Sequence, residues 1–378
     1  MRILIAPDSF KGSTSSLETA KCIRAGLTSV WPDCEARILP VADGGEGTVE
    51  ALVAGTGGTY RKCTVADPLG RPVEASFGLL PDGTAVIEMA QASGLPLLSA
   101  AERDPSVTST YGTGQMILKA LNLGCRHIIM GIGGSATNDG GAGMAAALGV
   151  KLLDRSGTPL APGGAALAKL DSIDISGIDP RIRETEFLIA SDVTNPLCGE
   201  SGASAVYGPQ KGADPQMVVE LDAALNRYGE KLKALFGRDF ASLPGAGAAG
   251  GLGAGLMAFC GGKLQPGIDI VFRMLSLERQ VALADLVITG EGRVDATSAS
   301  GKLLSGIGRL AIRYAKPVVA ITGCVGPGWE KLLDMGITAV VPIADGPITL
   351  EESLTQAPRL ITQAAIRIAQ LIQAGKTI

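Results

Sequence analysis

Short apolar runs alternate with amphipathic segments at both ends of the chain. Residues 2–8 (RILIAPD) form an apolar run that ends in a polar loop. Ser15 to Glu18 (SSLE) then has the pattern of a helix N-terminal capping box. Apolar side chains recur at helical spacing from Leu17 to Leu27. The pattern therefore predicts a strand, a loop and a helix in that order.

The same order recurs further along the chain. The expected strands lie within the runs ARILPVADGGEGT, ADLVITGEGRVD, PVVAITG and AVVPIAD, and helices are predicted from about Val49, from about Lys302, over Trp329 to Met335 and near the C-terminus. Strands that alternate with helices at this spacing are typical of a parallel, doubly wound sheet. The ends of the chain are thus expected to form a Rossmann-like α/β domain.

The middle of the chain has a different pattern. Residues 61–90 alternate and turn, with Pro81 to Gly83 as a hairpin turn, which predicts an antiparallel ribbon. Helices around 116–121 and 143–148 and a strand at 127–132 are expected to follow it. We therefore predict a Rossmann-like domain split in sequence, 1–60 and 266–378, and a mixed α/β domain inserted at 61–265. The active site is expected in the cleft between the two domains.

Composition excludes several classes of protein. Apolar residues make up 46% of the 378 and charged ones 19%, which rules out disordered and fibrous structure. The 33 basic and 37 acidic residues form no basic block, so neither nucleic acid nor a membrane is an expected partner. The N-terminus lacks the long apolar region of a signal peptide, so we expect a cytoplasmic protein.

Cysteine, histidine and glycine usage narrows the chemistry. The seven cysteines include no C-x-x-C pair, which argues against a disulfide framework and structural zinc. The single histidine, His127, argues against Ser-His-Asp hydrolysis and His-ligated metals. Gly112-Thr113-Gly114 lacks the third glycine of a dinucleotide fingerprint, which disfavours a nicotinamide-dependent oxidoreductase. The 52 glycines suggest backbone positions with positive φ or close approach to a ligand.

Polar residues follow the predicted strands of the first domain. Three loops carry them: Asp8, Ser9 and Lys11; Asp43, Glu46 and Thr48; and Glu291, Arg293 and Asp295. Ligands of open parallel sheets bind outside the carboxyl ends of the strands, so these loops are expected to share one crevice. Each residue taken alone is more simply explained as a solvated or capping side chain.

The inserted domain has comparable loops at 133–141, 191–196 and 207–212. The first, GGSATNDGG, runs into a predicted helix, where exposed N–H groups suit a phosphate. Equally, Asn138 or Asp139 there could cap the first turn of the helix. An inventory rich in carboxylates, lysines and glycine loops fits phosphoryl transfer, and Mg²⁺ suits such oxygen ligands.

Eight ordered motifs resemble those of one known family. They are APDSFKGS (6–13), ADGGEGT (42–48), DPLGRP (67–72), GGSATNDGG (133–141), SDVTNPLCG (191–199), GPQKGA (208–213), PGIDIV (266–271) and ITGEGRVDATSASGK (288–302). Together they resemble the bacterial glycerate kinases, the 2-phosphoglycerate-forming family. The resemblance implies phosphorylation of D-glycerate from ATP with Mg²⁺.

Given the resemblance, we assign hypothetical roles to residues in these motifs. The catalytic candidates are Asp192, Asp295 and Lys11, the two aspartates being a general base and a metal-linked carboxylate in undetermined order. The substrate-binding candidates are Asp8, Ser9, Arg71 and Arg293, with Lys11, Arg71 or Arg293 as the cation for the glycerate carboxylate. The nucleotide or phosphate candidates are Gly133, Gly134, Ser135, Asn138, Asp139, Lys211 and Glu291. Asp43 and Glu46 are expected to hold a water-coordinated Mg²⁺ or to brace their loop.

Several alternatives stay open. Thr297 stands where the family pattern leads us to expect Gln, which leaves the substrate preference open. The alternative functions are a kinase of another small hydroxy acid and a two-lobed small-anion binding protein. The sequence does not decide which hydroxyl is phosphorylated, where the nucleotide base binds, or the oligomeric state, a homo-oligomer included.

Overall fold

The computed structural model describes residues 1–300 and 302–375, which form two compact units. Unit 1 comprises Met1–Asp43, Glu50–Gly58 and the chain from Ile268 onward; unit 2 comprises Gly44–Val49 and Thr59–Gly267. The division lies close to the boundaries expected near residues 60 and 266. It differs in the segment Gly44–Val49, which groups with unit 2. Gly301, the next-to-last residue of the eighth motif, lies outside the described residues.

Unit 1 alternates strands and helices along the chain. Its strands are β1 (Arg2–Pro7), β2 (Glu35–Ile38), β11 (Leu286–Val294), β12 (Val318–Val325) and β13 (Ala339–Pro342). Its helices are α1 (Ser16–Val30), α10 (Leu277–Leu283), α11 (Ala296–Ser300), α12 (Lys302–Tyr314), α13 (Lys331–Asp334), α14 (Leu350–Thr355) and α15 (Ala357–Gly375). Two further helices, α2 (Thr48–Thr56) and α9 (Gly267–Met274), begin in unit 2 and continue into unit 1.

The strands of unit 1 form a parallel sheet in the order β13-β12-β11-β1-β2. In chain order within the unit this is the flavodoxin-like doubly wound arrangement, which differs from the Rossmann order. Pro7 pairs with Gly290, so the carboxyl ends of β1 and β11 lie at the same height. The strand order reverses between these two strands, which makes their ends the topological switch point of the sheet.

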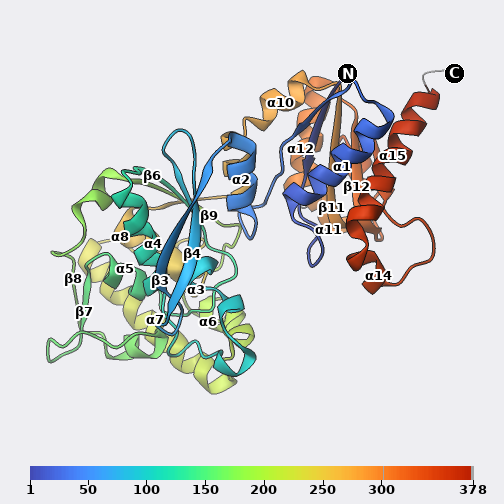
Figure 1. Ribbon diagram of the computed structural model, residues 1–378. Coiled ribbons are helices and arrows are strands. Elements are labelled where there is room, and N and C mark those ends of the chain that lie inside the picture. The colour runs from blue at the N-terminus through green and yellow to red at the C-terminus, as the bar shows by residue number, and fades with distance from the viewer. Residues whose placement is uncertain (301, 376–378) are drawn as a thin grey trace. The chain divides into compact units, whose positions relative to one another are not determined.

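Helices cover both faces of this sheet (Figure 1). Ile3 and Ile5 of β1 pack against Ile23 and Leu27 of α1 and against the apolar stripe of α15. Leu4 alternates with them, so it points to the opposite face, where α10 and α12 contact the sheet. As the capping-box pattern predicted, the N-cap side chain at the start of α1 accepts a hydrogen bond from the Glu18 N–H (3.2 Å).

Unit 2 is built around a larger, mixed sheet. Its strands are β3 (Thr59–Ala66), β4 (Pro72–Leu79), β5 (Ala85–Glu88), β6 (His127–Gly131), β7 (Lys151–Leu153), β8 (Ser172–Asp174), β9 (Glu186–Ala190) and β10 (Lys263–Gln265). Its α-helices are α3 (Ala90–Ser93), α4 (Tyr111–Asn122), α5 (Ala142–Ala147), α6 (Ala203–Tyr207), α7 (Pro215–Phe236) and α8 (Leu252–Cys260). Short 3₁₀ turns lie at Leu95–Leu97, Ala100–Glu102, Gly164–Lys169, Pro180–Glu184 and Pro209–Lys211.

The main sheet of unit 2 has the order β10-β9-β6-β5-β4-β3. The first four strands are parallel, whereas β4 and β3 continue antiparallel, so the ribbon expected at 61–90 is confirmed as the antiparallel edge of this sheet. Pro81 to Gly83 form the turn between β4 and β5. β7 and β8 make a separate two-stranded sheet.

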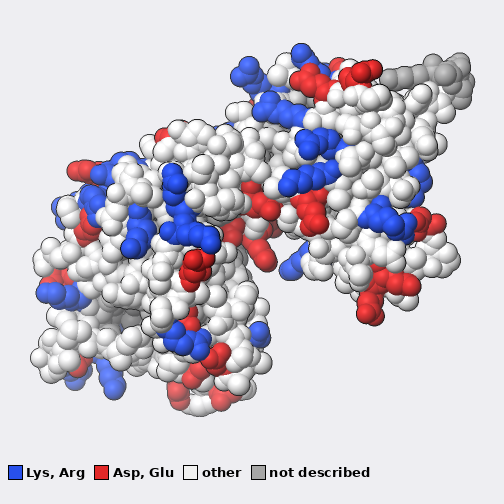
Figure 2. Space-filling model, viewed as in Figure 1, with Lys and Arg blue, Asp and Glu red and all other residues white. Residues whose placement is uncertain are grey.

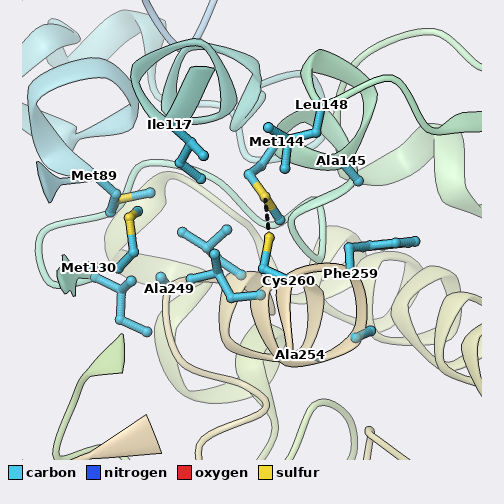
Figure 3. Close-up of a cluster of buried hydrophobic side chains, with 14 of the residues drawn as sticks. Met89, Ile117, Met130, Met144, Ala145, Leu148, Ala249, Ala254, Phe259 and Cys260 are labelled. Carbon is cyan, nitrogen blue, oxygen red and sulfur yellow. Dashed lines mark hydrogen bonds between the residues drawn. The ribbon is translucent and has the colours of Figure 1, made fainter. Parts of the chain in front are cut away.

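Small and flexible apolar side chains line the contact between α5 and α8 in the core of unit 2. Met144 of α5 and Cys260 of α8 meet there, the Cys260 thiol lying 4.0 Å from the Met144 sulfur (Figure 3). Ala145 and Ala254 face the same core from these helices, which lets the helices pack closely. Cys260 is buried, so burial raises the pKa of its thiol to about 12 and keeps it protonated.

Several predicted helices differ in extent from the observed ones. The helix expected over Trp329 to Met335 is the short α13, and the C-terminal helix is divided into α14 and α15 at Gln356. The helix expected from about Lys302 is α12, and a short helix, α11, precedes it. Among the described residues, no helix combines the length and the apolar composition that crossing a bilayer requires. Acidic and basic side chains are interspersed on the visible face of each unit (Figure 2).

The contact between α1 and α15 depends on Gly26. A Cβ added there would lie 2.4 Å from the Thr362 carbonyl oxygen and 2.7 Å from the Ala365 Cβ. Gly26→Ala gains about 1 kcal/mol in helix propensity, but we expect overpacking to outweigh it, giving a net loss of about 1–2 kcal/mol in the stability of unit 1.

Urea unfolding followed by tryptophan fluorescence measures this loss, because Trp31 and Trp329 both belong to unit 1. Lys21→Ala, at an exposed position of α1, is the matched control and should leave the midpoint close to that of the parent. A midpoint raised by Gly26→Ala would contradict the close approach.

Candidate functional site

Two carboxyl groups lie at the switch point of the unit 1 sheet. Asp8 follows β1 directly, and Glu291 lies in β11 one residue beyond Gly290, the partner of Pro7. The Asp8 N–H donates to the Gly290 carbonyl (2.8 Å), which continues the strand pairing and fixes the Asp8 backbone beside β11. The Ser9 N–H donates to Asp8 Oδ1 (2.6 Å).

Burial makes both carboxyl groups hard to ionise. Burial raises the pKa of Asp8 to about 6, and the negative charge of Asp43 adds to this effect. Burial likewise raises the pKa of Glu291 to about 7, and the charge of Asp8 raises it further, although the Ser298 hydroxyl donates to Glu291 Oε1. Perturbed carboxyl groups at a sheet switch point are typical of a functional site.

Asp295 lies in the opposite electrostatic situation. The Thr297 hydroxyl and N–H donate to its Oδ1 (2.6 and 2.9 Å), and Arg293 Nε donates to its Oδ2 (2.8 Å). These hydrogen bonds, those from Thr297 first, lower the pKa of Asp295 to about 2. Thr297, noted as a departure from the family pattern, therefore holds Asp295 in a fixed, ionised state.

Lys11 lies beside the same strand. A Cβ added at Gly292 of β11 would lie 3.4 Å from the Lys11 backbone nitrogen, so the turn after β1 runs close to the residue between Glu291 and Arg293. Lys11 is exposed, and among residues 1–300 and 302–375 its ammonium group has no ion-pair partner. Asp8, Ser9, Lys11, Glu291, Arg293 and Asp295 are thus gathered on neighbouring strand ends of unit 1.

A second set of strand ends gathers loops in unit 2. The segment Gly44–Val49 lies against the carboxyl ends of β5, β6 and β9. A Cβ added at Gly44 would lie 3.1 Å from the Ala190 Cβ, and one added at Gly131 would lie 3.2 Å from the Gly44 carbonyl oxygen. Glu88, the last residue of β5, accepts a hydrogen bond from the Val49 N–H (2.9 Å).

Asp43 precedes this segment, Glu46 lies within it, and both are exposed. No group of three or more His, Cys, Asp or Glu residues is arranged to hold a metal ion within the part of the chain that the structure describes. Asp43 and Glu46 therefore stay a predicted pair of ligands, to which a bound phosphate would have to add oxygen atoms.

The glycine loop at 133–141 divides into an exposed and a buried half. Gly133 and Gly134 are exposed, Ser135 is buried, and Gly134 has a positive φ of 73°. Asn138 and Asp139, expected on the phosphate side, are 0% and 1% exposed. Their side chains face the interior, so direct contact with a ligand would require the loop to open.

Asp139 holds the loop from within. Its carboxylate accepts hydrogen bonds from the Thr110 N–H and hydroxyl and from the N–H groups of Gly141 and Gly143, at 2.8–3.1 Å. Burial raises its pKa, and these hydrogen bonds oppose the rise. This arrangement is the capping role that the sequence left open for Asn138 or Asp139, here played by Asp139.

Lys211 is also internal, at 1% exposed. Its ammonium group donates to the Thr137 carbonyl (2.7 Å), which ties the 207–212 loop to the glycine loop. Burial lowers the pKa of Lys211 to about 7, although the charge of Asp139 acts in the opposite direction. A lysine in this position stabilises the loop, and its expected role as a phosphate ligand stays an untested prediction.

Two candidates of unit 2 remain, Asp192 and Arg71. Asp192 is exposed just beyond the end of β9, in a loop whose Ser191 N–H donates to the Gln265 carbonyl (3.1 Å). Arg71 is bound to two carboxylates, Asp67 and Glu102, with nitrogen–oxygen distances of 2.6 Å to each. Arg71 is therefore less available than Lys11 to a substrate anion.

Sequence reasoning missed two residues that shape these loops. Glu88 ends the apolar run AVIE, and a charged residue at the end of a buried strand was the signal that could have found it. Ser298, which donates to Glu291, had no such signal, because serine is common in any loop or helix end.

Comparison with known proteins agrees with the resemblance. The sequence profile of the Glycerate kinase family matches residues 3–373. The chain is 49% identical over 376 residues to the glycerate 2-kinase of Escherichia coli (strain K12), covering 99% of each chain. It is 48% identical over 379 residues to the glycerate kinase of Bacillus subtilis (strain 168), covering 100% of this chain and 99% of the relative.

A solved structure is similar over the full length. The crystal structure of a protein described as glycerate kinase 2 from Salmonella typhimurium LT2 is 49% identical, covers 100% of both chains and superposes with a TM-score of 0.90. Sequence profile, curated relatives and solved structure all span both units. The chain belongs to the glycerate kinase family.

Proposed function

We propose that this chain transfers the γ-phosphoryl group of ATP to D-glycerate, with Mg²⁺ as the accompanying cation and 2-phosphoglycerate as the favoured product. The full-length match to glycerate kinases carries the proposal, since a relative that shares 49% of its residues is named glycerate 2-kinase. The acidic switch point of unit 1 and the exposed glycines of unit 2 are groups that phosphoryl transfer uses.

The donor set of the 42–48 loop fits Mg²⁺. Asp43 and Glu46 present exposed carboxylate oxygens, and Mg²⁺ is bound by one or two carboxylates together with phosphate and water oxygens. We assign Asp43 and Glu46 as its protein ligands. When bound, the ion would neutralise charge on the transferred phosphoryl group.

Lys11 is the cation that we assign to the glycerate carboxylate. Arg71 and Arg293 each form an ion pair with at least one carboxylate of the chain, whereas Lys11 is exposed beside the switch point. Asp8 and Ser9 precede Lys11 by a few residues and offer a carboxylate and a hydroxyl group to the substrate hydroxyls. On the phosphate side, the exposed N–H groups of Gly133 and Gly134 suit phosphate oxygens.

The environments of the two candidate aspartates favour one division of roles. A general base works best with a pKa near the working pH, and the pKa of Asp295 is about 2. Asp295 is therefore suited to be a fixed negative charge linked to the metal. We accordingly assign proton acceptance from the glycerate hydroxyl to Asp192, which is exposed at the end of β9.

Incubation with ATP, Mg²⁺ and D-glycerate, with ADP followed by a coupled assay, tests the activity. We expect turnover with D-glycerate, and NMR of the product should show phosphate on the 2-hydroxyl. Turnover of lactate or tartrate in preference to D-glycerate would favour a different hydroxy-acid kinase. Binding of glycerate without ADP release would favour the anion-binding alternative, and a 3-phosphate product would overturn the regiochemistry.

Asp192→Asn should lower kcat by about 100-fold or more while ATP binding persists, because general-base help is lost. Asp295→Asn should instead raise the Mg²⁺ concentration required for half-maximal rate. Asp345→Asn, at an ion pair with Arg359 near α15, is the matched control for loss of one carboxylate. An unchanged kcat in Asp192→Asn would contradict the assignment of the base.

The raised pKa values of Asp8 and Glu291 predict that the stability of unit 1 depends on pH. The folded pKa values of about 6 and 7 lie above unfolded values near 4. The folded chain thus binds more protons in this range, and stability falls as the pH rises from about 4 to 7. At pH 8, Asp8→Asn and Glu291→Gln should each stabilise unit 1 by about 1–3 kcal/mol, although both lower activity.

Urea unfolding at pH 4.5 and pH 8 measures this difference, with tryptophan fluorescence as the signal. The gain should shrink toward the lower pH, where the parental carboxyl groups are protonated. Variants that are no more stable than the parent at pH 8 would show that the two carboxylates are solvated or compensated.

A further inference from the structure

We propose that Glu88 is a positioning residue, which holds the 42–48 loop in its working shape by accepting a hydrogen bond from the Val49 N–H at the start of α2. This inference deepens the proposed function, because it rests on the assignment of Asp43 and Glu46 as the residues of that loop that act on Mg²⁺ and phosphate. Glu88 is not itself placed in contact with either ligand.

The geometry at the start of α2 requires a hydrogen-bond acceptor. The first N–H groups of a helix have no partner inside it. Glu88 Oε1 accepts from the Val49 N–H at 2.9 Å, and the nearby N–H groups of Gly47 and Thr48 also favour the charged form of this carboxylate. Glu88 therefore completes the first turn of α2 from a neighbouring strand.

Burial makes these hydrogen bonds costly to lose. Glu88 is 9% exposed, and Thr48 is fully buried. A buried carboxylate is unfavourable unless hydrogen bonds or charges satisfy it. Here the backbone donors and the positive end of the α2 dipole satisfy it. The described residues include no ion-pair partner for Glu88, so the 47–49 backbone is what stabilises its charge.

Backbone contacts hold the rest of the 42–48 loop. The hydrogen bond between Glu88 and Val49 therefore fixes the position of its C-terminal end. Gly44 is so close to Gly267 that an added Cβ would lie 2.5 Å from the Gly267 Cα. The Thr48 hydroxyl donates to the Gly45 carbonyl (2.8 Å), which closes the turn. Glu46 lies between these two fixed points. Release of the 47–49 backbone would therefore move the Glu46 carboxylate first.

Two substitutions of Glu88 distinguish the effect of losing the hydrogen-bond acceptor from the effect of altered packing. Glu88→Leu removes the acceptor and introduces an apolar side chain of similar size, whereas Glu88→Gln keeps one carbonyl acceptor. We expect amide hydrogen exchange at residues 47–49 to accelerate strongly in Glu88→Leu and weakly in Glu88→Gln. The activity should fall by about 10- to 100-fold in Glu88→Leu and by less than about 10-fold in Glu88→Gln, as for other residues that orient ligands. The half-saturating Mg²⁺ concentration should rise in the same order.

Two controls match these changes. Val86→Ala alters a buried residue of the same strand, and Glu74→Gln removes an exposed carboxylate of the neighbouring strand β4. Neither should change exchange at residues 47–49 or the Mg²⁺ requirement. If Glu88→Leu does not fold, the exchange rates of Glu88→Gln decide the question, since the Val49 N–H then loses its charged acceptor.

Failure of the Glu88 proposal and failure of the proposed function give different results. Unchanged exchange at residues 47–49 in both Glu88 variants, or unchanged activity and Mg²⁺ requirement in Glu88→Leu, would overturn the proposal. Failure of the proposed function looks different: Asp43→Asn and Glu46→Gln would then keep the parental kcat and Mg²⁺ requirement. The hydrogen-exchange measurement tests the contact between Glu88 and the 47–49 backbone independently of that result.

Discussion

The parallel pairing of β1 with β11 is the constraint on which the acidic site of unit 1 depends. It joins residues almost 300 positions apart and sets Pro7 opposite Gly290. With that register fixed, the residues that follow must emerge together at the carboxyl edge of the sheet. A slip by one residue would turn every side chain of β1 to the opposite face of the sheet. Ile3, Leu4 and Ile5 are all buried, so packing on both faces protects the register.

Glycine plays a comparable part in unit 2. The sequence pointed to glycines that take positive φ or approach a ligand, and at two positions the structure shows a third use. A Cβ at Gly250 would lie 1.9 Å from the Thr137 carbonyl oxygen, and one at Gly255 would lie 2.6 Å from the Gly140 carbonyl oxygen. The glycine loop and the start of α8 thus approach backbone to backbone. Asp139 and Lys211 form hydrogen bonds with backbone groups of this loop from within, so its buried half supports the exposed Gly133 and Gly134.

Periodicity predicted the elements of unit 1 well, because β1, β11, β12 and β13 each contain an apolar run and each long helix has one apolar face. It predicted the site less well, because the sequence pattern of a polar residue after a strand is the same whether its side chain faces solvent or the interior. Asp8 and Asp139 illustrate the difference: both follow a strand in a Gly- or Ser-containing turn, yet only contacts distant in sequence bury Asp139 against Thr110. The same limit hid Glu88, whose partners lie about forty residues earlier on α2.

The carboxylates of unit 1 show how one sheet edge supplies groups of opposite character. Asp8 and Glu291 are half-buried with few donors, so they exchange protons near neutral pH, whereas Asp295 is held ionised by Thr297 and Arg293. Environments that separate pKa values in this way allow chemically identical groups to take different roles. The difference follows from position: Asp8 and Glu291 emerge where two central strands adjoin, and Asp295 lies beyond the end of β11, where a turn can donate to it. Stability of the unit and readiness for proton or cation binding are thus opposed at the switch point, and the sheet core beneath must supply the excess stability that keeps the two carboxyl groups there.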